Sequence, residues 1–238
     1  MRSSEEWSRL GGVLIVVLAA VAALVVVVPR LLGAAAGPEV EIITALKRTE
    51  QRGLALTVPG SSAQLLSQQH HFARITVNVA PGGQRAVAWA TLDFTGSMGS
   101  TEVSSLGVER VPFVLKEGEW VPERGAAPRL VAVVSALEAR RRALEAGDVA
   151  ALSVLLAPEA AGGAAEGGQE ELEGLLALQR RRYRARAWYL RLERDEATVS
   201  EQWRLEGDLP SRPVDERGQR QLSLLRRGEE FLFSSRLM

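Results

Sequence analysis

The chain has 238 residues, and its 29 basic and 29 acidic side chains give a formal net charge of zero. This balance argues against a general nucleic-acid-binding protein, which needs a basic surface. The chain contains no cysteine, which excludes disulfides, thiol catalysis and cysteine-ligated metal sites.

The N-terminal segment carries an uninterrupted apolar run, LGGVLIVVLAAVAALVVVV, over residues 10–28. A helix of about 20 apolar residues spans the hydrocarbon core of a bilayer. We therefore expect a cytoplasmic tail over residues 1–9 and a transmembrane helix over residues 10–32. A cleaved signal peptide is the alternative, because three alanines at residues 34–36 offer small side chains near a cleavage site. The run is, however, longer than the roughly 7–15 apolar residues of a signal peptide.

The charges around this run indicate the membrane orientation of the protein. Two arginines precede the run and one follows it closely, which favours a cytoplasmic N-terminus under the positive-inside rule. Only Lys47 and Lys116 are lysines among the 29 basic residues, a bias typical of a GC-rich bacterial genome. We expect a single-pass protein of the inner (cytoplasmic) membrane, with the bulk of the chain periplasmic.

A sequence pattern occurs twice in the remaining chain. The matching segments are VEIITAL (40–46) and VAVVSAL (131–137), LDFTG (92–96) and WRLEG (203–207), and VLKEGE (114–119) and LLRRGE (224–229). They occur in the same order in both places, which indicates an internal duplication. The sequence therefore predicts two tandem domains, residues 38–125 and 129–238.

Each repeat reads as helices followed by strands. In the second repeat we expect a helix that ends at Gly147, a short helix capped by Asp148, and a third helix over residues 169–182. We expect Arg140, with the two arginines that follow it, to be largely solvated. Alternating apolar residues predict strands in both repeats. These strands cover residues 73–79, 85–95, 108–115, 120–121, 183–193, 198–205, 219–225 and 230–233. The expected fold class is α+β, with each domain formed by helices on a curved antiparallel sheet.

One stretch of the second repeat carries a family resemblance. The segment ALEARRRALEAGDVAAL (136–152) is an amphipathic helix, a Gly-Asp pair and a second helix that leads to LLAP, and the repeat closes on RGEEFLF. These features resemble the nuclear transport factor two-like superfamily, also called SnoaL-like or cystatin-like. The resemblance implies two cone-shaped domains. A membrane span before this fold is also similar to periplasmic subunits of type IV secretion machines.

The resemblance implies where chemistry would lie, because enzymes of this superfamily place acids, Tyr or His inside the cone. The isomerase type pairs an Asp base with a Tyr oxyanion donor. Tyr183 and Tyr189 occupy alternate positions of one strand, so we expect both on one face and Trp188 on the other. These two tyrosines are the candidate ligand-binding residues. No buried acid is evident beside them, so no residue is assigned as catalytic and no cofactor is expected.

Other polar residues have simpler interpretations. Strand alternation predicts that Asp93 faces solvent. Adjacent residues of a strand point to opposite faces, so His70 and His71 cannot converge on one metal ion, and we expect no metal site. The arginines of residues 180–186 either contact anionic lipid head groups or mark a helix C-terminus followed by a solvated strand.

These features favour a membrane-anchored envelope protein that is not an enzyme. Its tandem domains would act as a scaffold that docks a protein partner, or self-associates, through the sheets. The alternative is a small-ligand-binding or isomerase-like enzyme that uses a pocket in the second repeat. A narrower form of the first hypothesis is a component of a secretion machine.

Overall fold

The computed structural model describes residues 37–158, 174 and 177–234. The predicted tail, the transmembrane helix and most of the predicted third helix of the second repeat lie outside these residues. Among the described residues, no helix is long and apolar enough to cross a bilayer. Residues Ile42–Met238 belong to one compact unit, to which the following description applies.

Three helices are described, α2 (Pro38–Arg52), α3 (Pro128–Ala146) and α4 (Val149–Val154). α3 ends as predicted at Gly147, whose φ of 70° closes the helix in the left-handed region. The predicted cap of α4 is also confirmed, because the backbone N of Ala151 donates to Asp148 Oδ1 at 2.9 Å. The expectation that Arg140 is solvated is wrong, since its side chain is fully buried beneath the helix.

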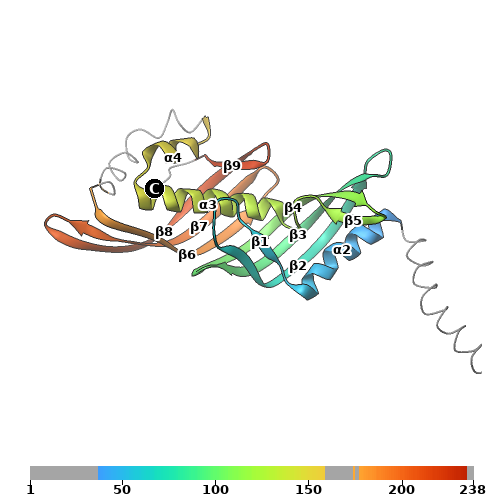
Figure 1. Ribbon diagram of the computed structural model, residues 1–238, viewed down its shortest axis with the longest axis horizontal. Coiled ribbons are helices and arrows are strands. Elements are labelled where there is room, and N and C mark those ends of the chain that lie inside the picture. The colour runs from blue at the N-terminus through green and yellow to red at the C-terminus, as the bar shows by residue number, and fades with distance from the viewer. Residues whose placement is uncertain (1–36, 159–173, 175–176, 235–238) are drawn as a thin grey trace, which may run out of the picture. The chain divides into compact units, whose positions relative to one another are not determined.

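In the described part of the chain, nine strands form a single sheet in the order β1-β2-β3-β4-β6-β7-β8-β9, and β5 pairs with β4 (Figure 1). The strands are β1 (Ala55–Thr57), β2 (Gln64–Val79), β3 (Arg85–Met98), β4 (Thr101–Lys116), β5 (Glu119–Pro122), β6 (Gln179–Leu192), β7 (Glu196–Leu209), β8 (Arg212–Arg227) and β9 (Glu230–Phe233). Helix α3 runs along one face and contacts β4, β6 and β9. The α+β class is thus observed, with longer strands than the sequence predicts.

A parallel pairing joins the two halves of the sheet, where Glu102–Gly107 of β4 pairs with Ala187–Leu192 of β6. The expectation of two separate antiparallel sheets is therefore wrong at this junction. Gly107 permits the close approach, because a Cβ at this position would overlap the carbonyl oxygen of Leu192.

The two halves repeat their strands at a constant spacing. β7, β8 and β9 each begin 111 residues after β3, β4 and β5, and the corresponding strands have equal lengths. The matched glycines of the sequence differ by one position. Gly118 is the second turn residue after β4, whereas Gly228 is the first turn residue after β8. The predicted boundary at residues 125–128 falls in the connection between β5 and α3.

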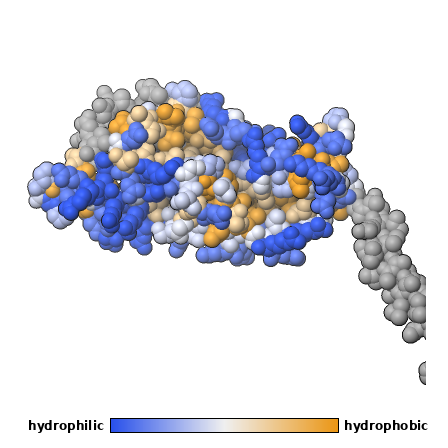
Figure 2. All heavy atoms as spheres, in the orientation of Figure 1, coloured by the Kyte–Doolittle hydropathy of each residue, from blue (hydrophilic) through white to orange (hydrophobic). Residues whose placement is uncertain are grey.

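The predicted helix over residues 169–182 is wrong at its C-terminal end, because β6 begins at Gln179. Arg182 pairs with Glu206 of β7, and its side chain is exposed. An exposed strand position keeps the charge of Arg182 in contact with solvent, as a helix C-terminus would. Figure 2 shows a hydrophilic tip on the β7–β8 hairpin and apolar side chains around α4, where Val154 is 75% exposed.

Candidate ligand-binding site

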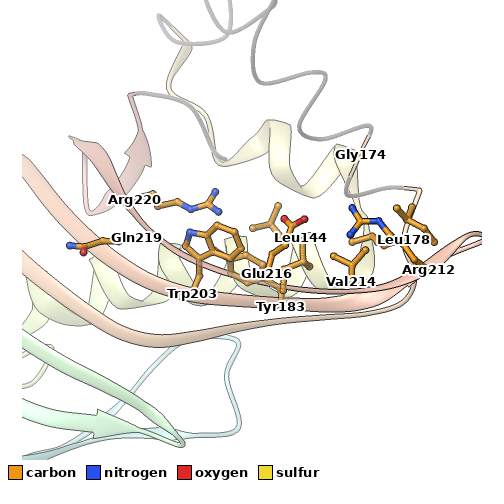
Figure 3. Close-up of a pocket in the computed structure, with 12 residues that line it drawn as sticks. Leu144, Gly174, Leu178, Tyr183, Trp203, Arg212, Val214, Glu216, Gln219 and Arg220 are labelled. Carbon is orange, nitrogen blue, oxygen red and sulfur yellow. The ribbon is translucent and has the colours of Figure 1, made fainter.

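A cavity of about 510 Å³ lies in the C-terminal half of the sheet, over β6, β7 and β8 (Figure 3). Its lining combines aliphatic, aromatic and charged side chains. The lining residues are Leu144, Gly174, Leu178, Tyr183, Trp203, Leu205, Leu209, Arg212, Val214, Glu216, Gln219 and Arg220. A cavity of this size and composition is typical of sites that bind small organic molecules.

The lining follows from strand alternation. Successive residues of a strand point to opposite faces, so Trp203 and Leu205 of β7 face inward together. On the neighbouring strand, Val214 and Glu216 do the same. The cavity is thus formed by the inward face of the sheet, which in the second half carries both apolar and charged residues.

The structure separates the two tyrosines that the sequence places together. Tyr183 is 1% exposed and lines the cavity, whereas Tyr189 is 44% exposed and lies outside its lining. A β-bulge between Ala185 and Ala187 inserts one residue into β6 and reverses the alternation beyond it. Trp188 therefore shares the inward face with Tyr183, and the prediction of one tyrosine face is wrong.

A buried carboxylate lies beside Tyr183. Glu201 is fully buried, and its Oε2 accepts the hydroxyl of Tyr183 at 2.7 Å and Nη1 of Arg140 at 2.9 Å. Its Oε1 accepts Nε1 of Trp188 at 3.1 Å. Arg220 approaches the same carboxylate, with its Nε 3.7 Å from Oε2. The expectation that no buried acid accompanies the tyrosines is therefore wrong.

The electrostatics of this cluster keep Tyr183 protonated and Arg140 charged. Burial raises the pKa of Tyr183, so its hydroxyl stays protonated and donates to Glu201. Burial is the largest influence on Arg140 and lowers its pKa, but Glu201 and Tyr183 together outweigh this effect, so the pKa of Arg140 is raised. The cluster is a buried ion pair whose carboxylate also accepts an aromatic hydroxyl.

Aromatic stacking shapes the end of the cavity nearest this cluster. The rings of Tyr183 and Trp203 lie nearly parallel, with centroids 6.2 Å apart. The guanidinium of Arg220 lies 4.5 Å from the Trp203 centroid, a cation–π arrangement visible in Figure 3. Gly218 leaves room for the indole, because a Cβ there would lie 2.9 Å from Trp203 Cζ2.

A second buried acid lies at the junction of the two halves. Glu109 of β4 is fully buried and accepts the backbone N–H groups of Arg129 (2.9 Å) and Leu130 (2.7 Å) at the start of α3. The guanidinium of Arg129 donates to the carbonyl oxygens of Val108 (2.6 Å) and Arg194 (2.6 Å). Burial raises the pKa of Glu109 to about 7. This cluster ties α3 to both halves of the sheet.

Sequence reasoning missed both buried acids, although a signal for them exists. Glu201 follows Ala197 and Val199 at alternate, inward positions of β7, and Glu109 precedes Val111 on the inward face of β4. A charge in an apolar alternation indicates a buried polar site. The partner of Glu201 is Arg140, which comes from helix α3 and is distant in the sequence. No local sequence pattern reveals this pairing.

The remaining sequence candidates do not converge on a site. Asp93 is exposed as predicted, and His70 and His71 point to opposite faces. An acid lies near them, since Glu50 Oε1 is 3.4 Å from His71 Nδ1. Among the described residues, no three potential ligands cluster as a metal site. Of the arginines in residues 180–186, Arg184 lies at an exposed position of β6.

Comparisons with known proteins return NTF2-like (nuclear transport factor two-like) structures. A candidate ketosteroid isomerase from Shewanella frigidimarina is similar, with 13% identity over 44% of this chain and 91% of that chain and a TM-score of 0.38. A candidate dehydratase of the NTF2-like family from Streptomyces avermitilis has 17% identity over 45% of this chain and 92% of that chain, with a TM-score of 0.37.

A longer match is an NTF2-like protein involved in plasmid conjugation. It has 9% identity over 73% of this chain and 77% of that chain, with a TM-score of 0.33. No family model and no curated protein matches the chain. All these TM-scores are below 0.5, so the site is interpreted from its own geometry.

Proposed function

We propose that this protein is a membrane-anchored, NTF2-like component of the bacterial envelope whose C-terminal half binds a small amphipathic molecule. The observation that carries the proposal is the cavity of about 510 Å³ over β6, β7 and β8. The proposal includes a tandem duplication, which the constant spacing of 111 residues between corresponding strands supports.

Binding fits the site better than catalysis. A general base needs a carboxylate that faces the substrate, but the Glu201 carboxylate already accepts hydrogen bonds from Arg140, Tyr183 and Trp188. The Tyr183 hydroxyl is directed at Glu201. The acid that lines the cavity, Glu216, is exposed. The polar cluster therefore holds the cavity floor in place.

The binding test uses the full chain in lipid nanodiscs. Purified protein is analysed by native mass spectrometry and by solvent extraction for a co-purifying small molecule. Leu205→Phe fills the cavity from its lining, and Leu106→Phe is the control on an exposed position of β4. We expect a bound molecule in the wild type and the control, and its loss in Leu205→Phe. Equal occupancy in all three proteins would contradict the proposal.

Protein docking is a second candidate function, favoured by two exposed apolar side chains on the outward face of the β4–β6 junction. Leu106 is 57% exposed and Tyr189 is 44% exposed, on adjacent parallel strands. The partner would be a second copy of this chain or another envelope protein. Because the chain has no cysteine, Leu106→Cys allows site-specific crosslinking in membranes. An absence of crosslinks at this position, with crosslinks elsewhere, would refute this candidate.

Membrane anchoring and orientation form a separate part of the proposal. It rests on the apolar run of residues 10–28. A protease added to spheroplasts should digest the C-terminal part of the chain, and membranes washed at alkaline pH should retain the protein. Release by the wash would remove the anchor, and protection from the protease would reverse the orientation.

A further inference from the structure

The ligand class can be narrowed further on the basis of the proposed binding function. Trp203 lines the cavity, and its Nε1–H is buried without a hydrogen-bond partner among the described residues. A buried donor left unbonded destabilises the folded protein, and such groups in native proteins usually have a structural or functional reason. A ligand that presents an acceptor atom to this indole would satisfy it.

Charge selects among the possible acceptors. The lining contains two guanidinium groups, Arg212 and Arg220, and one carboxylate, Glu216. Arg220 lies over the ring of Trp203, so a cation and the indole donor occupy the same end of the cavity. A hydrogen bond from the indole N–H or from a guanidinium to an anion is roughly twice as strong as one between neutral groups.

Five aliphatic side chains also line the cavity, beside Tyr183 and the amide of Gln219. They are Leu144, Leu178, Leu205, Leu209 and Val214. These five side chains contribute no hydrogen bonds, so the part of the ligand that lies against them is apolar. The site therefore requires an anionic group and an apolar body in one molecule.

We infer that the ligand is an amphipathic carboxylic acid. Its carboxylate accepts the indole N–H of Trp203 beside Arg220, and its alkyl or aryl body lies against the leucines. The buried pair of Arg140 and Glu201 holds Tyr183 in place under the stacked indole. The outward-facing arginines of β6 take no part in this site.

The test compares three probes with one apolar body: 4-phenylbutyrate, 4-phenylbutanol and 4-phenylbutylamine. Binding to the full chain in nanodiscs is measured by calorimetry, with empty nanodiscs as the blank. We expect the acid to bind at least about tenfold more tightly than the alcohol, with the amine weakest. Trp203→Phe keeps the ring and removes the N–H, and should reduce the preference for the acid severalfold. The control Trp89→Phe alters a partly exposed indole on β3 and should preserve it.

The outcomes separate the two levels of the proposal. Equal binding of acid and alcohol, abolished by Leu205→Phe, would overturn the inferred acid and leave the binding function standing. Failure of all three probes to bind would overturn the inference, and the mass-spectrometric test then decides the binding function independently. The comparison of the three probes is made on wild-type protein and needs no variant. Misfolding of Trp203→Phe would therefore neither support nor overturn the inference.

Discussion

The two halves of the sheet place different chemistry at corresponding positions. Phe94 of β3 pairs with His70, and Leu205, 111 residues later on β7, pairs with Tyr183. Each partner also contacts its nearby helix. His70 Nε2 lies 3.2 Å from Thr49 Oγ1 of α2, whereas the ring of Tyr183 lies under the guanidinium of Arg140 of α3. The same framework thus holds a small neutral contact in one half and an ion-paired cluster in the other.

The two halves place their aromatic side chains at different positions of the inward face. Phe72 and Phe94 are fully buried in the N-terminal half. By strand pairing, Ala185 and Leu205 occupy the corresponding positions in the other half. In the same register Trp203 takes the place of Leu92 and Tyr183 takes the place of His70, so the rings of the C-terminal half lie at other positions of the inward face. A duplicated framework can therefore carry differently shaped sites in its two halves.

The largest expected effect comes from breaking the buried pair of the C-terminal half. Arg140→Met leaves the Glu201 carboxylate buried without its closest cation. Removal of one partner of such a pair costs about 3–5 kcal/mol. We expect the free energy of unfolding in urea, followed by circular dichroism on the detergent-solubilised full chain, to fall by about this amount.

The matched variant lies at the corresponding contact of the N-terminal half. Thr49→Ala removes a hydroxyl that contacts His70 and should cost about 1 kcal/mol. The double variant Arg140→Met with Glu201→Leu should recover part of the loss, because no buried carboxylate remains. Equal costs at Thr49 and Arg140 would show that the two halves do not differ in this respect.

A second prediction concerns Glu109, which corresponds by spacing to Arg220. Burial raises the pKa of Glu109 from 4.5 to about 7, so the folded state binds this proton more tightly than the unfolded state. Its contribution to stability is therefore fully present below pH 4.5 and is lost as the pH rises through 7. Between pH 4.5 and pH 8 the free energy of unfolding should fall by about 3 kcal/mol from this group.

Glu109→Gln should remove this pH dependence, while Glu102→Gln, an exposed position of the same strand, should preserve it. The measurement is a series of urea unfolding curves from pH 4.5 to pH 8. An identical slope in wild type and Glu109→Gln would show that another group controls stability in this range.

The sequence predicts the local features of this fold and misses those that depend on distant partners. The alternation that buries Ala86, Ala88 and Ala90 was readable in β3, and so was the end of α3 at Gly147. The bulge at residues 185–187 was not, because it depends on how β6 pairs with β7. The sequence therefore places Tyr183 on one face with Tyr189, whereas in the structure it shares its face with Trp188.

The burial of two acids was missed for a related reason. The strand alternation places Glu201 and Glu109 at inward positions, but the partners that satisfy them lie 61 and 20 residues away and cannot be read from the local sequence. The parallel pairing of β4 with β6 has no local signal either. The two strands are far apart in the sequence, so their pairing cannot be read from either one. The need for glycine at position 107 follows only from the close approach of Leu192.

An exchange of residues between the halves tests whether Leu205 borders free space while Phe94 fills a packed core. Leu205→Phe introduces the residue that the N-terminal half carries, into an open cavity. It should leave the free energy of unfolding unchanged or raise it by about 1 kcal/mol. Phe94→Leu removes part of a fully buried ring and should lower it by about 1–2 kcal/mol. Urea unfolding measures both. A loss of stability in Leu205→Phe comparable to that of Phe94→Leu would mean that the cavity is not free to accept a ring.

The smallest expected effect is a pH dependence of opposite sign in the N-terminal half. Burial lowers the pKa of His70 below its usual 6.5, and the nearby Glu50 only partly offsets this. The folded state therefore binds this proton less tightly, so the contribution of His70 is present above pH 6.5 and is lost as the pH falls through its folded pKa. His70→Gln should flatten the rise in stability from pH 5 to pH 7. Asn78→Gln, at an exposed position of the same strand without a titratable group, is the control. Measured in the Glu109→Gln background, where the opposing titration is absent, a slope that survives His70→Gln would assign the pH response to another group and remove this contrast between the halves.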